Sequence, residues 1–249
     1  MTRKVERETW DKKELRERLR AGARSLGVEL SAAQVGMFLR YGQELAAWNE
    51  RVNLSAIKNP ADVITKHFLD SLAVVPYLPF EAENIVDVGS GAGLPGLALK
   101  VARPELDVLL VESIGKKVEF LRHVTAVLNL VGVEVVKVRA EELGQNPSYR
   151  ERYQVGVARA VAMLPVLAEL VLPLVKLGGL FIAFKGPDVR EELEAAQRAF
   201  TLLGGEVEAV HEWKLPGGAG QRSIILVRKV SATPPQYPRA PGRPGKRPL

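Results

Sequence analysis

A glycine-rich segment, Asp87 to Gly96, carries the strongest chemical signal in the sequence. It reads Asp-Val-Gly-Ser-Gly-Ala-Gly-Leu-Pro-Gly and follows a β-branched run. Pro95 falls near the first position of the helix expected next, where its missing N–H costs nothing. The glycines let the backbone turn sharply and let a ligand lie against bare main chain. About 20 residues further on, Glu112 ends the next predicted strand, where an acid can accept both ribose hydroxyls of an adenosine cofactor.

The same segment fits two cofactors. From Gly91 onward it satisfies the G-x-G-x-x-G fingerprint of dinucleotide-binding proteins. Asp87, however, stands two residues before the first glycine, as in the D/E-x-G-x-G-x-G loop of methyltransferases. There the carboxylate helps hold the cationic methionine end of S-adenosylmethionine, directly or through water. The sequence therefore favours S-adenosylmethionine, with a nicotinamide-dependent dehydrogenase or a non-catalytic RNA-binding module as the alternatives.

Two later strand ends add candidate residues. The third predicted strand runs into Ala140-Glu141, a loop that covers adenine in such folds, although the same letters also suit a solvated helix start. The fourth ends in Ala158-Arg159-Ala160, where methyltransferases place the residues nearest the methyl group. Arg159 is either a surface ion-pair partner or a cofactor and phosphate contact. The chain has no cysteine and no N/D-P-P-F/Y/W signature here, which disfavours cytosine-C5 and adenine-amine chemistry.

The elements that position these residues alternate between strand and helix. Short β-branched runs predict strands at 85–88, 108–111, 133–138, 154–158 and 180–184, with helices that include 97–101, 116–130, a turn near Glu141, 161–175 and 189–203. Such alternation indicates a parallel, doubly wound sheet. Two last runs, 207–215 and 223–229, are joined by a short Gly-rich link and predict an antiparallel hairpin. The predicted class is α/β, a Rossmann-like S-adenosylmethionine-dependent methyltransferase fold.

The two ends of the chain differ from this pattern. Residues 1–75 show helical periodicity in three places: at 12–27, from an N-capping Ser31 to about Trp48, and after Pro60. They therefore predict a small helical N-terminal subdomain. Residues 76–230 form the predicted catalytic domain. Residues 231–249 are rich in proline and arginine and predict a disordered tail.

Composition and charge limit the function classes. Apolar residues make up 47% and charged residues 26% of the chain, no apolar run is long enough to span a membrane, and the first residues resemble no signal peptide. A cytoplasmic protein is expected. The net charge is +6, of which Arg239, Arg243, Lys246 and Arg247 supply four and the body two. This balance suits a polyanionic partner without requiring one.

Five segments together resemble a known family. They are Arg51-Val-Asn-Leu-Ser-Ala56, His67-Phe-Leu-Asp-Ser-Leu72, the segment 87–96, Glu112-Ser113 and Ala158-Arg159-Ala160. The chain thereby resembles the glucose-inhibited division protein B family, bacterial 16S rRNA guanine-N7 methyltransferases, over about residues 30–229. The resemblance implies methyl transfer from S-adenosylmethionine to guanine N7 in small-subunit rRNA. A monomer without a metal is expected, and the tail beyond Val230 lies outside the family pattern.

The resemblance also assigns site residues. With the loop motif, it implies cofactor contacts at Asp87, Gly89, Gly91, Leu94, Glu112, Ser113, Ile114, Ala140, Glu141 and Arg159. Candidate RNA contacts are Arg51, Asn53, Lys66, His67, Lys185 and Arg222. Catalytic candidates are Asn53, His67 and Arg159, although the sequence alone favours a hydrogen-bonded packing role for His67, and Lys185 equally suits a plain loop position. Guanine N7 carries a lone pair and no proton, so a site without an evident base fits it.

Overall fold

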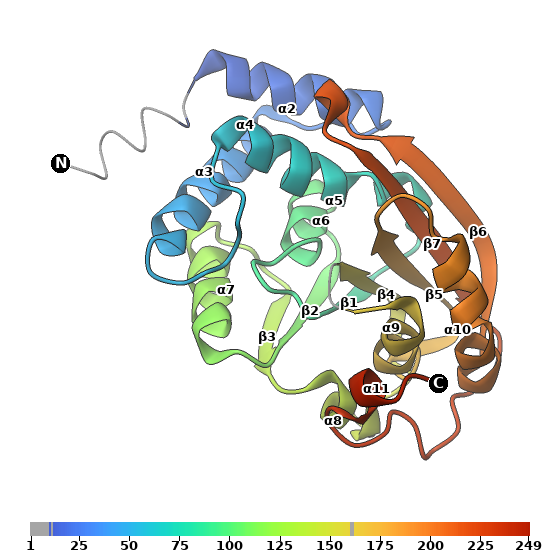
Figure 1. Ribbon diagram of the computed structural model, residues 1–249. Helices are drawn as coiled ribbons and strands as arrows, with labels where there is room; N and C mark the ends of the chain where they lie inside the picture. The colour runs from blue at the N-terminus through green and yellow to red at the C-terminus, as the bar shows by residue number, and fades with distance from the viewer. Residues whose placement is uncertain (1–9, 11, 160–161) are drawn as a thin grey trace.

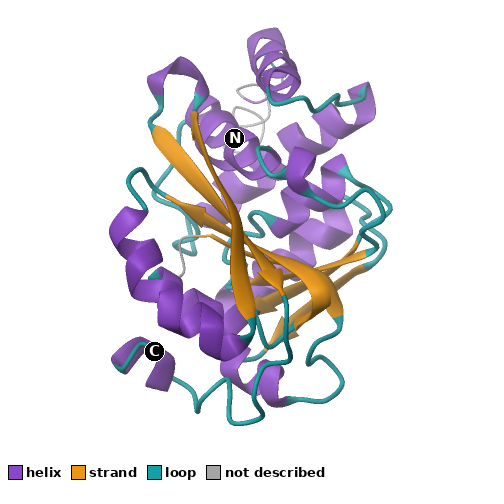
Figure 2. Cartoon of the chain, turned by 90° about the vertical axis from the view of Figure 1, so that its right-hand side faces the viewer, coloured by secondary structure: helices purple, strands orange, loops and turns teal. Residues whose placement is uncertain are grey.

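The computed structural model describes residues 10, 12–159 and 162–249, in which one twisted sheet separates two layers of helices (Figures 1 and 2). Its strands are β1 (Asn84–Val88), β2 (Asp107–Glu112), β3 (Val133–Lys137), β4 (Tyr153–Arg159), β5 (Val175–Lys185), β6 (Gly205–Lys214) and β7 (Gln221–Lys229). The spatial order is β3-β2-β1-β4-β5-β7-β6. Strands β1 to β5 pair in parallel, and β7 runs antiparallel between β5 and β6. The predicted α/β fold and its closing hairpin are confirmed.

Helices precede and connect the strands. They are α2 (Lys13–Ser25), α3 (Ala32–Asn49), α4 (Pro60–Val63), the π-helix η1 (Ile64–Leu69), α5 (Asp70–Leu72), α6 (Gly96–Ala102), α7 (Gly115–Val127), α8 (Ala140–Gln145), α9 (Leu164–Val171), α10 (Arg190–Leu203) and α11 (Arg243–Lys246), with 3₁₀ turns η2 (Val75–Tyr77) and η3 (Pro216–Gly218). Ser31 caps α3 as predicted, in a reciprocal capping box with Gln34. The helix predicted over 161–175 is wrong at its end, because α9 stops at Val171 and β5 already begins at Val175. Pro173 has no N–H with which to continue the helical hydrogen bonds.

Alternate residues of each strand face the two layers. Ile85 of β1 joins one core cluster with Phe38 of α3 and Phe120 of α7, whereas Val86 joins a second with residues of α9 and α10. The N-terminal helices thus share a core with the sheet and lie over one face of it. Because the inner part of the sheet is covered on both faces, strands such as β1 and β2 carry apolar residues at successive positions. The division of the chain at residue 75 stays a prediction.

The disordered tail predicted for residues 231–249 is wrong. Arg239 donates three hydrogen bonds of 2.6–3.1 Å from its guanidinium to the carboxylate of Glu169, which is fully buried in α9. The backbone N–H of Arg239 adds a fourth, at 2.8 Å. Figure 1 shows the end of the chain lying beside α8 and α9. The segment has too little apolar surface for a core of its own, but polar contacts to the domain order it.

Among the described residues, no helix is long and apolar enough to cross a membrane.

Candidate active site

The glycine loop leaves β1 in a conformation that its glycines make possible. Gly89, Gly91 and Gly93 have φ angles of +74°, +56° and +84°, a region that residues with a Cβ rarely adopt. A Cβ on Gly93 would also lie 2.6 Å from the hydroxyl of Tyr41. That hydroxyl, on the fully buried Tyr41 of α3, donates to the carbonyl of Ala92. An N-terminal helix therefore helps fix the loop, a contact that the sequence does not reveal.

Asp87 lies beneath the loop with one oxygen unpartnered. Its Oδ2 accepts the N–H of Gly96 at 2.9 Å, while Oδ1 is buried and has no hydrogen-bond partner. Burial raises the pKa of Asp87 to about 7, against the Gly96 N–H and the positive charge of Arg159, which lower it. A buried acceptor without a partner is costly unless a ligand or water satisfies it.

Glu112 is the last residue of β2, the strand next to β1, and contacts the loop from there. Its carboxylate accepts the N–H of Gly91 at 3.1 Å through Oε2 and the N–H of Ile114 at 2.8 Å through Oε1. Each oxygen retains a further lone pair for a hydroxyl donor. Ile114 exposes half of its surface, although it is apolar. The predicted contacts 112–114 therefore lie around one loop, next to the glycines.

Ala140 and Glu141 begin α8, directly after β3. Both are largely buried, at 9% and 8% exposure. Because β3 lies next to β2 in a parallel sheet, its carboxyl end reaches the edge at which β2 presents Glu112. One oxygen of the Glu141 carboxylate already has a hydrogen-bond partner, because Oε1 accepts the N–H of Gly242 at 2.9 Å.

The carboxyl ends of β4 and β5 border an open cleft of about 450 Å³. It is lined by Lys66, His67, Asp70, Arg159, Phe184, Lys185, Gly186, Glu192 and Arg222. Five predicted contacts from four separate parts of the chain thus share one cleft, with four cationic and two acidic side chains. Arg51 and Asn53 are not among the lining residues.

Asp70 joins two of the arginines. Its Oδ2 accepts from Arg159 at 3.0 Å, and its Oδ1 lies 3.4 Å from Nε of Arg222. Arg159 also donates to the carbonyl of His67, at 3.3 Å. Burial raises the pKa of Asp70, and the two arginines oppose that rise. Arg159 is therefore an ion-pair partner inside the cleft, and a cofactor contact by it stays a prediction.

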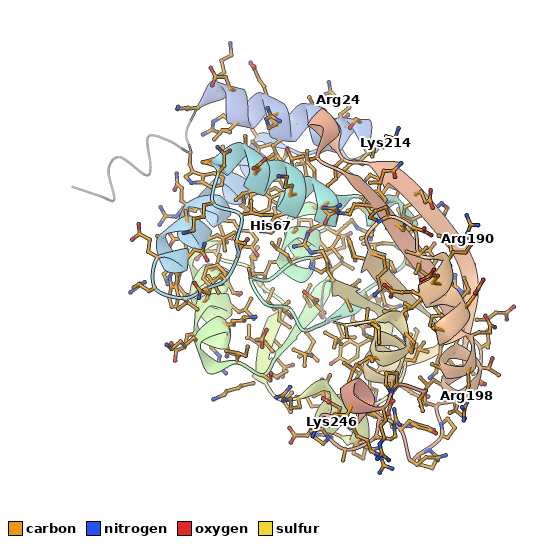
Figure 3. All side chains as sticks on the ribbon, in the orientation of Figure 1. Arg24, His67, Arg190, Arg198, Lys214 and Lys246 are labelled. Atoms are coloured by element: carbon orange, nitrogen blue, oxygen red, sulfur yellow. The ribbon has the colours of Figure 1, made fainter. Side chains whose placement is uncertain are left out.

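His67 is held neutral with both ring nitrogens engaged. Its Nδ1 lies 3.2 Å from the carbonyl of Lys66, which can only accept, so Nδ1 carries the proton. Nε2 then accepts from the hydroxyl of Ser55 at 2.6 Å. Burial lowers the pKa of His67 to about 4, and Arg159 adds to the shift. His67 comes from η1 (Figure 3), and π-helical turns of this kind are frequent at functional sites.

The Arg51–Ser55 loop is tied to the cleft through Ser55. Asn49 accepts the N–H groups of Leu54 and Ser55 at 2.8 and 3.0 Å and donates to the Ser55 carbonyl at 2.7 Å. The guanidinium of Arg51 lies over the Trp48 ring, 5.0 Å from its centre, and Asn53 is exposed. Sequence reasoning missed Asn49, which stands in no recognisable motif, and the pairing of Asp70 with Arg222, which lie far apart in the sequence.

Lys185 is the most constrained of the predicted RNA contacts. Its ammonium lies 2.6 Å from Glu192 and donates to the carbonyl of Ala162 at 2.8 Å. Its charge is therefore largely compensated within the protein. The neighbouring predicted residue Ala160 lies outside the described residues.

Comparisons with known proteins agree with this geometry. A family model described as rRNA small subunit methyltransferase G matches residues 34–225. A ribosomal RNA small subunit methyltransferase G of Chloroflexus aggregans is 48% identical over 223 residues, which cover 90% of this chain and 93% of that protein. A protein of the same description from Acetivibrio thermocellus is 44% identical over 241 residues, 96% of this chain and 99% of that protein.

The last match also corrects the view of the C-terminal segment. A span of 96% of the chain leaves fewer residues outside it than the stretch 231–249 contains, so part of that stretch has a counterpart in this relative. Among solved structures, a ribosomal protein L11 methylase of Lactobacillus delbrueckii subsp. bulgaricus has a TM-score of 0.50 at 12% identity, over 67% of this chain and 79% of that one. At such identity the likeness concerns the fold alone.

Proposed function

The chain belongs to the rRNA small subunit methyltransferase G family, and from that premise we propose that it transfers a methyl group from S-adenosylmethionine to N7 of one guanine in 16S rRNA. The observation that carries the cofactor assignment is the unpartnered oxygen of buried Asp87 beneath the glycine loop. We expect the enzyme to act in the cytoplasm as a monomer without a metal.

The residues around the loop fit the cofactor. Glu112 would accept the ribose hydroxyls, and Asp87 would face the cationic methionine end. The backbone at Gly89, Gly91 and Leu94 would line the space between them. Residues 113–114 and 140–141 would enclose the adenine. When bound, S-adenosylmethionine supplies a methyl group on a positively charged sulfur.

The state of His67 supports N7 as the acceptor. Guanine N7 has an in-plane lone pair and no proton, so it attacks the methyl group without a general base, and the protein needs only to align it and exclude water. His67 is a poor base, because burial lowers its pKa to about 4 and its Nε2 already accepts from Ser55. The cations of the cleft, Lys66 and Arg222 among them, would contact the RNA backbone. Arg159 and Asn53 would position the cofactor and the base.

Mapping the product tests the proposed function. We expect the purified protein, given labelled S-adenosylmethionine and unmethylated small subunits or 16S rRNA, to form one 7-methylguanosine per RNA. Mass spectrometry of nuclease fragments would locate it. A product in which the label sits on an exocyclic amine, a ribose or a pyrimidine would contradict the N7 assignment. Binding of reduced nicotinamide dinucleotide in place of S-adenosylmethionine would favour the dehydrogenase.

Glu112→Ala should weaken cofactor binding at least tenfold. The carboxylate pairs with two ribose hydroxyls through charge-assisted hydrogen bonds, each worth about 1.5–3 kcal/mol. Calorimetry with S-adenosylmethionine and with 5′-methylthioadenosine should give the same loss, because both carry the ribose. An unchanged dissociation constant in the folded variant would contradict the assignment. Glu134→Ala, at an exposed position of β3, is a matched control.

A further inference from the structure

The C-terminal segment, residues 231–249, is bonded directly to α8. Besides the Gly242 contact to Glu141, Gln145 at the end of α8 donates to the carbonyls of Pro238 at 2.8 Å and Pro235 at 3.2 Å. A Cβ on Gly144 would lie 2.7 Å from the Pro238 ring, so the segment and the helix touch closely. Both ends of the short helix are therefore held by the segment.

Arg150 joins the C-terminal segment to α8 through hydrogen bonds. Its Nη1 donates to the carbonyls of Gly144 and Tyr237, both at 2.7 Å. Its Nη2 donates to those of Thr233 at 2.7 Å and Pro234 at 3.2 Å. One guanidinium thus satisfies a carbonyl of the last turn of α8 and three of the segment. Charged donors make such bonds stronger than neutral ones.

The segment is in turn anchored to the rest of the domain at two points. One is the Arg239–Glu169 pair on α9, with the carboxylate fully buried. The other is Lys229 at the end of β7, whose buried ammonium donates to the carbonyls of Leu172 and Leu203 and to the hydroxyl of Thr233. Because these two anchors fix the segment to the domain, its contacts with α8 can hold that helix in place.

Helix α8 needs such support. It has six residues, far fewer than a helix requires to be stable by itself in water. Its first two residues are Ala140 and Glu141, which the proposed function places at the adenine. If α8 were loose, cofactor binding would have to order it, and that ordering would reduce the affinity.

We propose that residues 231–249 act as a positioning element for the cofactor, holding α8 so that Ala140 and Glu141 are pre-arranged at the adenine end. This inference rests on the proposed function. Arg150, which lies outside the cleft-lining residues, is the positioning residue that joins the two parts.

Arg150→Ala tests the inference, with Lys246→Ala as control. Lys246 is exposed on α11 at the same end of the molecule, so the control removes the same charge from this region (Figure 3). We expect Arg150→Ala to weaken the binding of S-adenosylmethionine and of 5′-methylthioadenosine by the same factor, at least fivefold. The affinities are compared at a temperature at which the variant is fully folded. The KM for S-adenosylmethionine should rise while kcat at saturating cofactor stays unchanged. Amides 140–145 should exchange hydrogen faster.

The outcomes separate the possible failures. Unchanged affinity and unchanged exchange of α8 in folded Arg150→Ala, with only a lower Tm, would overturn the inference and leave the proposed function standing. Absence of S-adenosylmethionine binding by the unaltered protein would contradict the proposed function and the inference with it. If Arg150→Ala does not fold, Gln145→Ala provides the same comparison, because Gln145 is exposed and loses only its two bonds to the segment.

Discussion

An RNA that carries 7-deazaguanosine in place of the target guanosine should accept no methyl group from this enzyme. The substitution replaces the nucleophilic nitrogen by a C–H and leaves the Watson–Crick edge and the backbone unchanged. In-line transfer to N7 then has no lone pair to attack the sulfonium methyl. Because recognition of the base and phosphates is retained, the modified RNA should still bind and should compete with the natural substrate.

The measurement is tritium transfer to two synthetic RNAs that differ only at the target position, with a filter-binding assay of each. Equal affinity with incorporation at background in the modified RNA is expected. A third RNA, with 7-deazaguanosine at a neighbouring guanosine, serves as control and should be methylated normally. Incorporation at the normal rate into the RNA modified at the target position would move the acceptor to another atom.

The parts of the site that the sequence predicts are those made by contiguous residues. The strand, glycine loop and helix from Ile85 to Val101 are local in the chain, and turn chemistry alone requires glycine at Gly89 and Gly91. Glu112 follows from the regular spacing of one strand–helix unit. The parallel pairing of the first five strands follows from the alternation of strand and helix, and the antiparallel hairpin of β6 and β7 follows from the short link between them.

The parts that could not be predicted depend on contacts between distant segments. Asp70 meets Arg159 and Arg222 only because α5, β4 and β7 converge, and no spacing in the sequence encodes that meeting. For the same reason, the sequence did not predict that residues 231–249 have an ordered structure. Composition describes what a segment can bury by itself, whereas Arg239 is ordered by a carboxylate 70 residues away.

Replacing Asp87 by Asn should weaken S-adenosylmethionine binding about a hundredfold at pH 8, which corresponds to about 2.7 kcal/mol. The amide oxygen can still accept the Gly96 N–H, so the fold should survive. What is lost is the negative charge beside a cationic ligand in a site shielded from water, where such pairs are strong. Binding of 5′-methylthioadenosine, which lacks the charged methionine end, should be nearly unaffected.

The same carboxylate should make binding depend on pH. Burial raises the pKa of Asp87 to about 7, so the group is ionised above that pH and protonated below it. Since the ionised form binds the cation, a proton must leave before the cofactor binds at lower pH. Affinity should therefore be constant above about pH 8 and fall about tenfold per unit below pH 7, with a proton released on binding.

Calorimetry between pH 5.5 and 8 in two buffers of different ionisation enthalpy would measure both the affinity and the released proton. In Asp87→Asn the profile should be flat at the weak level, and 5′-methylthioadenosine should give a flat profile with either protein. A steep profile that persists in the variant would assign the titration to another group. His67 cannot be that group, because burial lowers its pKa to about 4, and the side chain therefore stays neutral throughout this pH range. The pH dependence thus distinguishes a carboxylate that binds the charged end of the cofactor from one that only supports the glycine loop.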